Sequence, residues 1–418
     1  MTACQSTSGT RSSASSAQTT HRSLVVNEFN VSGQYVDFSQ IHALQLHRAS
    51  NPGSAPVLEL KGNQQLELIF ETLSFDSRQF RVTFTHHNPD WSRSSLPEDF
   101  FIDGVFTHYL DAGQVSRVQR PDYRQYNFRF PDNRFNFSKS GNYMIRVEDQ
   151  DTGNLVISLP FFVTENEGSV RSNVEELRLP RQNLRITHRP VNRYILPEIV
   201  EQPIFDLEFY VTQNQFWGRA VRARELDFSD PVEVQFEIDS RNSFTGDYEF
   251  LTLSLTNLSQ TNPQITGTEP DEIPPLLYLS DDASGFASGG RSVSGRFGRP
   301  VHNLNGQYAN VVFTFDPSRE IQPGQQIFLV GDFNNWIISS DNRLIKNESI
   351  NRWQTNAIIK EGTYSYKYVL IERDKVDDLF FDDLFGGTQQ EYHTFVYMRD
   401  SREFYYRLLH VNHFTSGI

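Results

Sequence analysis

The chain has 418 residues with 38 Lys and Arg against 52 Asp and Glu, and its formal net charge of −14 argues against a nucleic-acid-binding protein, which needs a basic face. At roughly 100 to 200 residues per domain, this length predicts two to four domains. Only 37% of the residues are apolar but 13% are aromatic, so large rings must supply much of the buried area and favour β-structure.

The N-terminal segment 1–24 is predicted to anchor and tether the protein. Its Cys4 is the only cysteine, which excludes an intramolecular disulfide. Residues 1–5 are similar to the end of a bacterial lipobox, so we expect lipidation at Cys4 after removal of a signal peptide encoded upstream of Met1. Residues 5–23 are almost all small or polar and are expected to form a flexible tether. The alternative is a chance cysteine near the start of a cytosolic chain.

Residues 25–166 have the period of two that is typical of β-strands with one face in a core. Leu68 and Phe70, for example, alternate with Glu67 and Glu71, which predicts that the two glutamates face solvent. About seven such segments are separated by turns rich in Asn, Asp, Gly and Ser. This spacing predicts an N-terminal β-sandwich.

Residues 167–304 are predicted to form a middle β-sandwich, with strands at 206–212, 232–238 and 249–255. It ends in a stretch at 260–300 that is rich in Gly, Ser, Pro and Asp, which we expect to be a long loop that is mobile or reaches outward.

Residues 305–418 are predicted to form a C-terminal sandwich, and only 174–179 and 378–384 favour a short helix. The chain is therefore expected to be all-β, with about three tandem immunoglobulin-like or early-set β-sandwich domains. The expected strands of the last domain are 310–315, 326–332, 353–359, 362–371 and 391–398.

The sequence lacks the motifs that usually mark catalysis. It contains no Gly-x-Ser-x-Gly elbow, no phosphate-binding glycine loop and no His-Glu-x-x-His, so we expect no catalytic residues and no enzyme activity. His86 and His87 would face opposite sides of a strand, and His410 and His413 have no third ligand candidate nearby. The acidic stretch 374–383 lacks the spacing of a calcium loop. We therefore expect neither a metal site nor a cofactor.

The most distinctive local motif is VGDFNNW at 330–336, followed by Trp353 and by GTYSYKYV at 362–369. It resembles the early-set immunoglobulin-like domains of glycogen-binding carbohydrate modules and branching enzymes. This resemblance implies glucan binding, with Trp336 and Trp353 stacking on sugar rings and Lys367 beside them. The alternative is that the same rings and glycines build the sandwich core and its turns.

Landmarks along most of the chain together resemble the type IX secretion system plug protein family of Bacteroidota-like bacteria, a former family of unknown function. The sequence departs from that family at His87, where the family has Cys, and in the insertion at 260–300. The matching landmarks are 83–91, 107–109, 140–143, 211–214, 330–336, 391–399 and 405–408.

The resemblance implies a non-enzymatic periplasmic protein that docks under the SprA-type outer-membrane translocon barrel and plugs its periplasmic opening. A lipid at Cys4 would then hold it to the inner leaflet of the outer membrane. The alternative function is that of a carbohydrate-binding module protein of the cell envelope.

Overall fold

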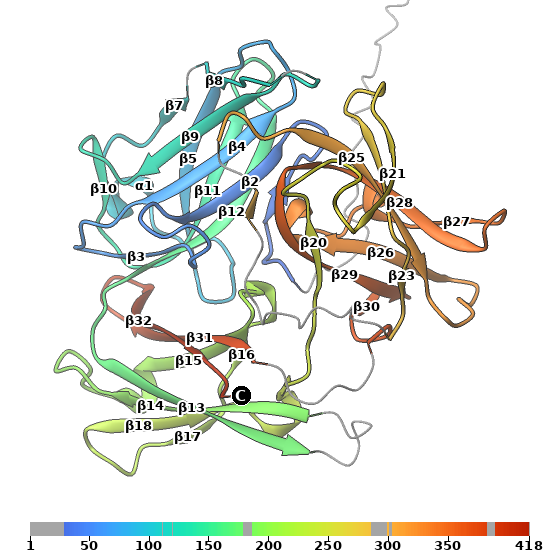
Figure 1. Cartoon of the computed structure of the whole chain (residues 1–418). Helices are drawn as coiled ribbons and strands as arrows, with labels where there is room; N and C mark the ends of the chain where they lie inside the picture. Colours follow the sequence, from blue (N-terminus) through green and yellow to red (C-terminus); the bar gives the residue numbers. More distant parts are fainter. Residues whose placement is uncertain are drawn as a thin grey trace, which may run out of the picture.

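A computed structural model describes residues 29–417, apart from 111, 119, 179–185, 286–298, 301–302 and 383–388. The chain forms three β-sandwiches, and the few helices are single turns. In Figure 1 the N-terminal sandwich lies at the upper left, the C-terminal sandwich at the right and the middle sandwich below both. The prediction of an all-β chain with about three sandwiches is confirmed.

Two sheets enclose the core of the N-terminal sandwich, and a short helix, α1 (Glu98–Phe101), lies beside them. Rings fill this core; Phe84, for example, lies 5.2 Å from Phe130 and 5.3 Å from Phe137, centroid to centroid. One sheet has the order β1 (Tyr35–Val36), β12 (Leu155–Thr164), β11 (Gly141–Asp149), β5 (Phe80–His87), β7 (His108–Leu110), with β3 (Val57–Glu59) beside β12. The other has the order β2 (His42–Arg48), β4 (Leu66–Thr72), β9 (Arg124–Phe130), β8 (Gln114–Val115), and β6 (Ile102–Gly104) pairs with β10 (Phe135–Phe137).

The middle sandwich is completed by the end of the chain, because the last two strands pair with β15. Its first sheet has the order β13 (Ser169–Arg178), β14 (Ile186–Ile195), β18 (Glu233–Glu237), β17 (Glu225–Asp227), with β19 (Phe244–Thr245) beside β14. Its second has the order β16 (Val221–Arg222), β15 (Leu207–Gln213), β31 (Glu391–Asp400), β32 (Tyr405–Thr415). The short helices are α2 (Pro203–Asp206) and the 3₁₀ turns η1 (Trp217–Arg219) and η2 (Ser240–Asn242).

The C-terminal sandwich begins well before residue 305. One sheet contains β20 (Leu251–Ser254), β29 (Gly362–Glu372), β24 (Arg299–Pro300), β26 (Gln325–Gly331) and β30 (Lys375–Asp377). The other has the order β21 (Ile265–Glu269), β22 (Leu276–Leu279), β25 (Tyr308–Asp316), β28 (Arg352–Lys360), β27 (Ile345–Asn347), with β23 (Asp282–Ala283) beside β25. The 3₁₀ turns are η3 (Asp332–Asn334) and η4 (Ser340–Asn342).

The predicted division at residue 304 is therefore corrected by the strand pairing. β20, β21, β22 and β23 belong to the C-terminal sandwich, and the β31–β32 hairpin belongs to the middle one. Four strands, β21 to β24, also lie inside the stretch 260–300 that was expected to be a loop, and 174–178 are strand rather than helix. The alternating pattern predicts that a segment is a strand but carries little information about a partner far away in sequence.

Several strands are buried on both faces, contrary to the expectation of one wet face. All seven residues of β4 are buried, as are the first eight of β31. The reason is that the sandwiches pack against each other through the outer faces of their sheets. The face shared by the N-terminal and middle sandwiches buries Met144, Phe162 and Phe395.

Candidate functional site at the junction of the sandwiches

Aromatic rings from three parts of the chain meet where the sandwiches join. Phe29 enters from the N-terminal side, Phe216 from the loop after β15, and Trp336 from the turn after β26. The ring centroids lie 4.8 Å apart for Phe29 and Phe216 and 5.2 Å apart for Phe216 and Trp336. The ring of Phe250 lies 5.1 Å from that of Trp336 and 6.1 Å from that of Phe216, centroid to centroid. The junction is therefore a small hydrophobic core of its own, and it ties the sandwiches together.

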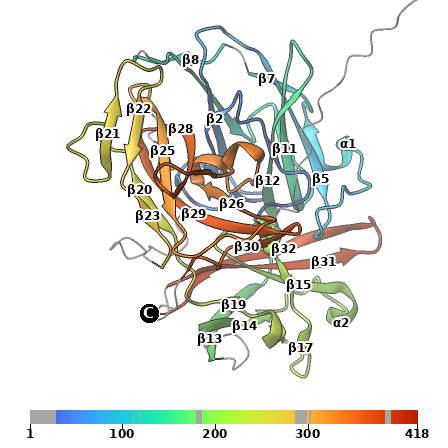
Figure 2. The same cartoon turned by 90° about the vertical axis from the view of Figure 1, so that its right-hand side faces the viewer.

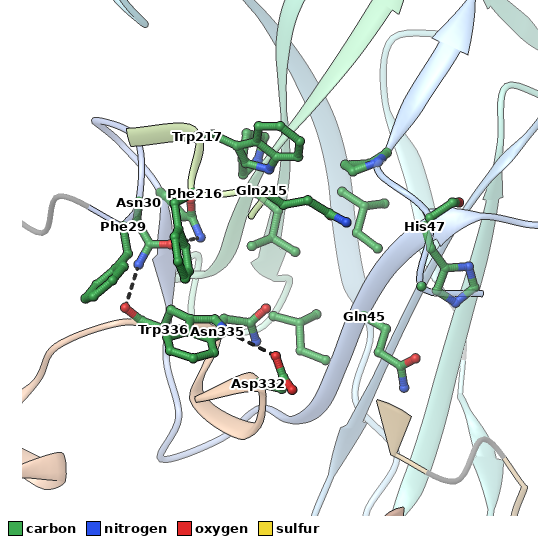
Figure 3. Close-up of a pocket in the computed structure, with 18 residues that line it drawn as sticks. Phe29, Asn30, Gln45, His47, Gln215, Phe216, Trp217, Asp332, Asn335 and Trp336 are labelled. Carbon is green, nitrogen blue, oxygen red and sulfur yellow. Dashed lines mark hydrogen bonds between the residues drawn. The ribbon is translucent and has the colours of Figure 1, made fainter. Parts of the chain in front are cut away.

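The VGDFNNW motif forms the turn that aims Trp336 into this core (Figure 3). Its Asn334 accepts a hydrogen bond from the amide of Gly331 at 2.9 Å, which closes the turn. Asn335 and Trp336 both have left-handed backbone angles, with φ of 49° and 57°. The indole Nε1 donates to Asp332 Oδ1 at 3.0 Å. Gly331 is needed because a Cβ there would lie 2.7 Å from the carbonyl oxygen of Ser365.

A cavity of about 160 Å³ lies beside Trp336, between rings and side-chain amides. Figure 3 shows Gln215 and Gln45 on different walls of it, with His47 farther along. Asp332 is the only carboxylate among the described lining residues, and its oxygens accept hydrogen bonds from Trp336 Nε1 and from the amide of Ser365. Such a lining suits polar contacts and ring packing rather than acid–base chemistry, which usually needs a pair of carboxylates or an activated nucleophile.

Lys367 lies at the same junction and has partners inside the protein. Its Nζ forms an ion pair with Asp382, donates to the carbonyl oxygen of Glu249 at 3.0 Å and lies 4.5 Å from the centre of the Tyr248 ring. The side chain is 4% exposed. Trp353, in contrast, is a half-buried residue of β28, where it pairs with Phe315 of β25. These two strands belong to the sheet of the C-terminal sandwich that does not contain Lys367.

The structure thus brings Trp336 and Lys367 to one junction but leaves Trp353 elsewhere. Trp336 is 4% exposed, and its ring packs against those of Phe29, Phe216 and Phe250. A glucan would need exposed ring faces arranged along one surface. Sugar binding by these three residues stays a prediction, as does lipidation of Cys4, which lies outside the described residues.

Comparison with known families identifies the N-terminal sandwich. Residues 41–165 match the family model for the first domain of the type 9 secretion system plug protein. The N-terminal sandwich is therefore similar to the first domain of this family, and we refer to it as the plug domain. No curated protein shows a significant match to the chain.

One solved structure shares its fold with most of the chain, including the segments that follow the plug domain. A hypothetical protein from Parabacteroides merdae, known from its crystal structure, aligns with a TM-score of 0.81 and 19% identity, over 92% of this chain and 99% of that one. At this identity the likeness shows the fold alone. The C-terminal domain of the Streptococcus agalactiae antigen I/II polypeptide BspA, at 7% identity over 90% of this chain and 97% of that one, has a TM-score of 0.18, which carries no argument.

Landmark residues of the plug domain make contacts with the C-terminal hairpin. The amide of Leu408 donates to Ser140 Oγ at 3.0 Å, and Tyr397 donates to Asn142 Oδ1 at 2.7 Å. Between them, Gly141 has a φ of 143°, and a Cβ there would lie 2.3 Å from the His86 ring. The Ser-Gly-Asn sequence is therefore explained by contacts between segments about 250 residues apart.

A buried ion pair, which no local pattern of residues predicts, joins the plug domain to the C-terminal sandwich. Glu71 of β4 lies 2.6 Å from Lys360 Nζ of β28, and both side chains are about 1% exposed or less. Tyr308 and Gln125 also donate to the Glu71 carboxylate, at 2.6 and 2.7 Å. Burial raises the pKa of Glu71 and lowers the pKa of Lys360, while the attraction between them opposes both shifts.

The histidines of the plug domain shape its turns. His86 donates from Nε2 to the carbonyl oxygen of Ser140 at 3.0 Å, so its Nδ1 accepts from Ser94 at 2.9 Å, and burial lowers its pKa to about 4. The ring of His87 forms hydrogen bonds with the hydroxyl group of Thr85 and with the carbonyl oxygen of Trp91. Within the described residues no group of three or more His, Cys, Asp and Glu could hold a metal ion, and no helix is long and apolar enough to cross a membrane.

Proposed function

We propose that the protein is a non-enzymatic, periplasmic component of the type IX secretion system that binds the SprA-type outer-membrane translocon barrel and plugs its periplasmic opening. The observation that carries this proposal is the match of residues 41–165 to the first domain of the plug family. The family's description as a plug protein of the type 9 secretion system supports this role.

The packing of the three sandwiches supports this role. A plug has to keep its shape against the opening that it fills, and three modules on flexible linkers would not. Here the junction core around Trp336 and the buried pair of Glu71 and Lys360 fix the sandwiches to each other. A closed body of this kind can form a contact of about 1,600 Å², the usual size for a specific and reversible complex.

A lipid on Cys4 would add to this binding. The tether of residues 5–23 would keep the folded part near the membrane and raise its effective concentration at the translocon. Substitution Cys4→Ala should therefore move the protein from the membrane fraction to the soluble periplasm without changing its binding to purified translocon.

The direct test is co-purification. A tagged copy of the full chain should recover the translocon barrel from outer membranes solubilised in mild detergent, and the Trp336→Ala variant, which disturbs the junction, should recover less. Failure of the wild-type chain to recover the barrel, under conditions where the barrel stays soluble and intact, would refute the proposal.

A further inference from the structure

Six large apolar residues are exposed along one side of the molecule, and they come from four separate segments. We call this surface the apolar edge. Its three phenylalanines, Phe404, Phe205 and Phe100, are exposed at 80%, 78% and 55% of their full accessible area. The complete set is Phe100, Ile199, Ile204, Phe205, Val232 and Phe404. Single exposed apolar residues are ordinary, but a group gathered from distant segments is typical of an interaction site.

Hydrogen bonds and an ion pair place Phe100 near Phe404. Ser138 Oγ donates to the carbonyl oxygen of Phe100 at 2.8 Å. The next residue, Lys139, forms an ion pair with Glu403 and lies 5.6 Å from the ring of Tyr405. Helix α1 of the plug domain therefore lies beside the turn that joins β31 and β32, and both views show them on the same side of the molecule (Figures 1 and 2).

Strand pairing places Phe205 near the same turn. Helix α2 leads directly into β15, whose first residue Leu207 pairs with Met398 near the end of β31. Val232 joins this group because its carbonyl oxygen accepts a hydrogen bond from the amide of Leu196 at 2.9 Å. Figure 2 shows α1, the end of the β31–β32 hairpin and α2 in succession down one side.

Phe404 is held in an unfavourable conformation at the most exposed point. Its φ is 58°, in the left-handed region where Gly or Asn is normally found. The turn is fixed by Asp400, whose carbonyl oxygen accepts from the amide of Phe404 at 2.9 Å and whose carboxylate accepts from the amide of Arg402. A phenylalanine here costs conformational energy and gains no burial within the chain, which points to a contact with another molecule.

The charge around the apolar edge indicates what that molecule is. The segments 98–101, 198–206, 230–232 and 401–404 contain seven acidic residues and one basic residue, Arg402; Lys139, which is paired with Glu403, and the exposed Arg399 lie beside them. The acidic residues are Glu98, Asp99, Glu198, Glu201, Asp206, Asp230 and Glu403. An anionic lipid surface would repel such an edge, and a symmetric dimer through it would bring like charges together. A protein surface with an apolar centre ringed by Lys and Arg is complementary to it.

We infer that the apolar edge is the surface through which this protein contacts the outer-membrane translocon, at an apolar patch of the translocon that is surrounded by basic residues. This inference rests on the proposed function for the identity of the partner. Phe404 and Phe205 supply the central contacts, and the acidic residues steer association.

The test compares two variants of the full chain. One combines Phe100→Ser, Phe205→Ser and Phe404→Ser. The control is Phe75→Ser. Phe75 is 64% exposed and precedes the first residue of β5, whereas α1 follows the last residue of that strand. Affinity for detergent-solubilised translocon should fall by about ten-fold or more in the triple variant, as for central interface aromatics, and by less than about two-fold in the control. Both variants should unfold at the wild-type temperature, because the replaced rings are exposed.

Photo-crosslinking identifies the occupant of the surface. A benzophenone amino acid at position 404 should crosslink to the translocon in outer membranes, and one at position 75 should not. If wild-type chain binds and the triple variant binds equally well, or if position 404 crosslinks to lipid or to a second copy, the inference is wrong while the proposed function stands. If the wild-type chain does not bind the translocon, the proposed function fails and the inference fails with it.

Discussion

Removing one partner of the Glu71–Lys360 pair should destabilise the protein strongly. In Lys360→Met the Glu71 carboxylate stays buried between two sandwiches, with Tyr308 and Gln125 as donors but no counter-charge. Breaking a buried pair in this way costs about 3–5 kcal/mol. We expect a loss of this size in the free energy of unfolding, measured by urea denaturation with tryptophan fluorescence.

The double variant separates the buried charge from the packing. In Glu71→Gln with Lys360→Met, the amide oxygen of Gln can still accept from Tyr308 while no charge is buried. Because neutral replacements of buried pairs are often nearly neutral in stability, the double variant should regain most of the loss. The single variant Glu71→Gln completes the cycle. The change in the free energy of unfolding of the double variant, minus the sum of the changes in the two single variants, gives the coupling energy between the two side chains.

The pH dependence of Lys360→Met provides a second check. The folded-state pKa of Glu71 is raised above 4.5 by burial, so the folded state binds the proton more tightly than the unfolded chain does. The loss in the free energy of unfolding caused by Lys360→Met should therefore be greatest above the raised pKa of Glu71, and it should shrink as the pH falls toward 4.5. A Lys360→Met variant that loses less than about 1 kcal/mol at pH 7, or a double variant no more stable than the single one, would refute this reasoning.

Three further predictions concern the junction, a histidine and the sugar hypothesis. Trp336→Ala should lower the free energy of unfolding by about 3–5 kcal/mol, because a buried ring is removed. Burial lowers the pKa of His86 to about 4 from 6.5, so unfolding should become easier as the pH falls from 6.5 toward 4, by up to about 3 kcal/mol, and less so in His86→Gln. Soluble glucan at millimolar concentration should leave the tryptophan fluorescence unchanged; a saturable change lost in Trp353→Ala would support sugar binding instead.

The sequence predicted the type of each segment more reliably than its position in the fold. Alternation identified β4 and β31 as strands, but it could not show that other sandwiches cover their second faces. Glu71 was expected in solvent for this reason, and its partner Lys360 is 289 residues away. Likewise, nothing local to the hairpin at 391–415 indicates that it pairs with β15. Long-range partners depend on the shape of the whole fold, which a single pattern of residues does not record.

The motif around Trp336 shows that the candidate site, too, could not be predicted from residue types alone. Its residue types resemble a sugar-binding module, and they also form the turn that aims the indole ring at Phe216 and Phe250. Only the surroundings of the ring distinguish the two uses. The apolar edge had no signal in the sequence, because its residues come from four separate segments that meet only in the folded chain.

The central claim is that this protein closes the translocon, and ion conductance tests it most directly. Translocon barrel purified without its partners and reconstituted in planar bilayers should conduct, and adding the full chain on the periplasmic side should reduce the conductance in a saturable manner. The triple variant at Phe100, Phe205 and Phe404 should require a higher concentration for the same effect. Unchanged conductance at a concentration where the wild-type chain is bound to the barrel would contradict the account.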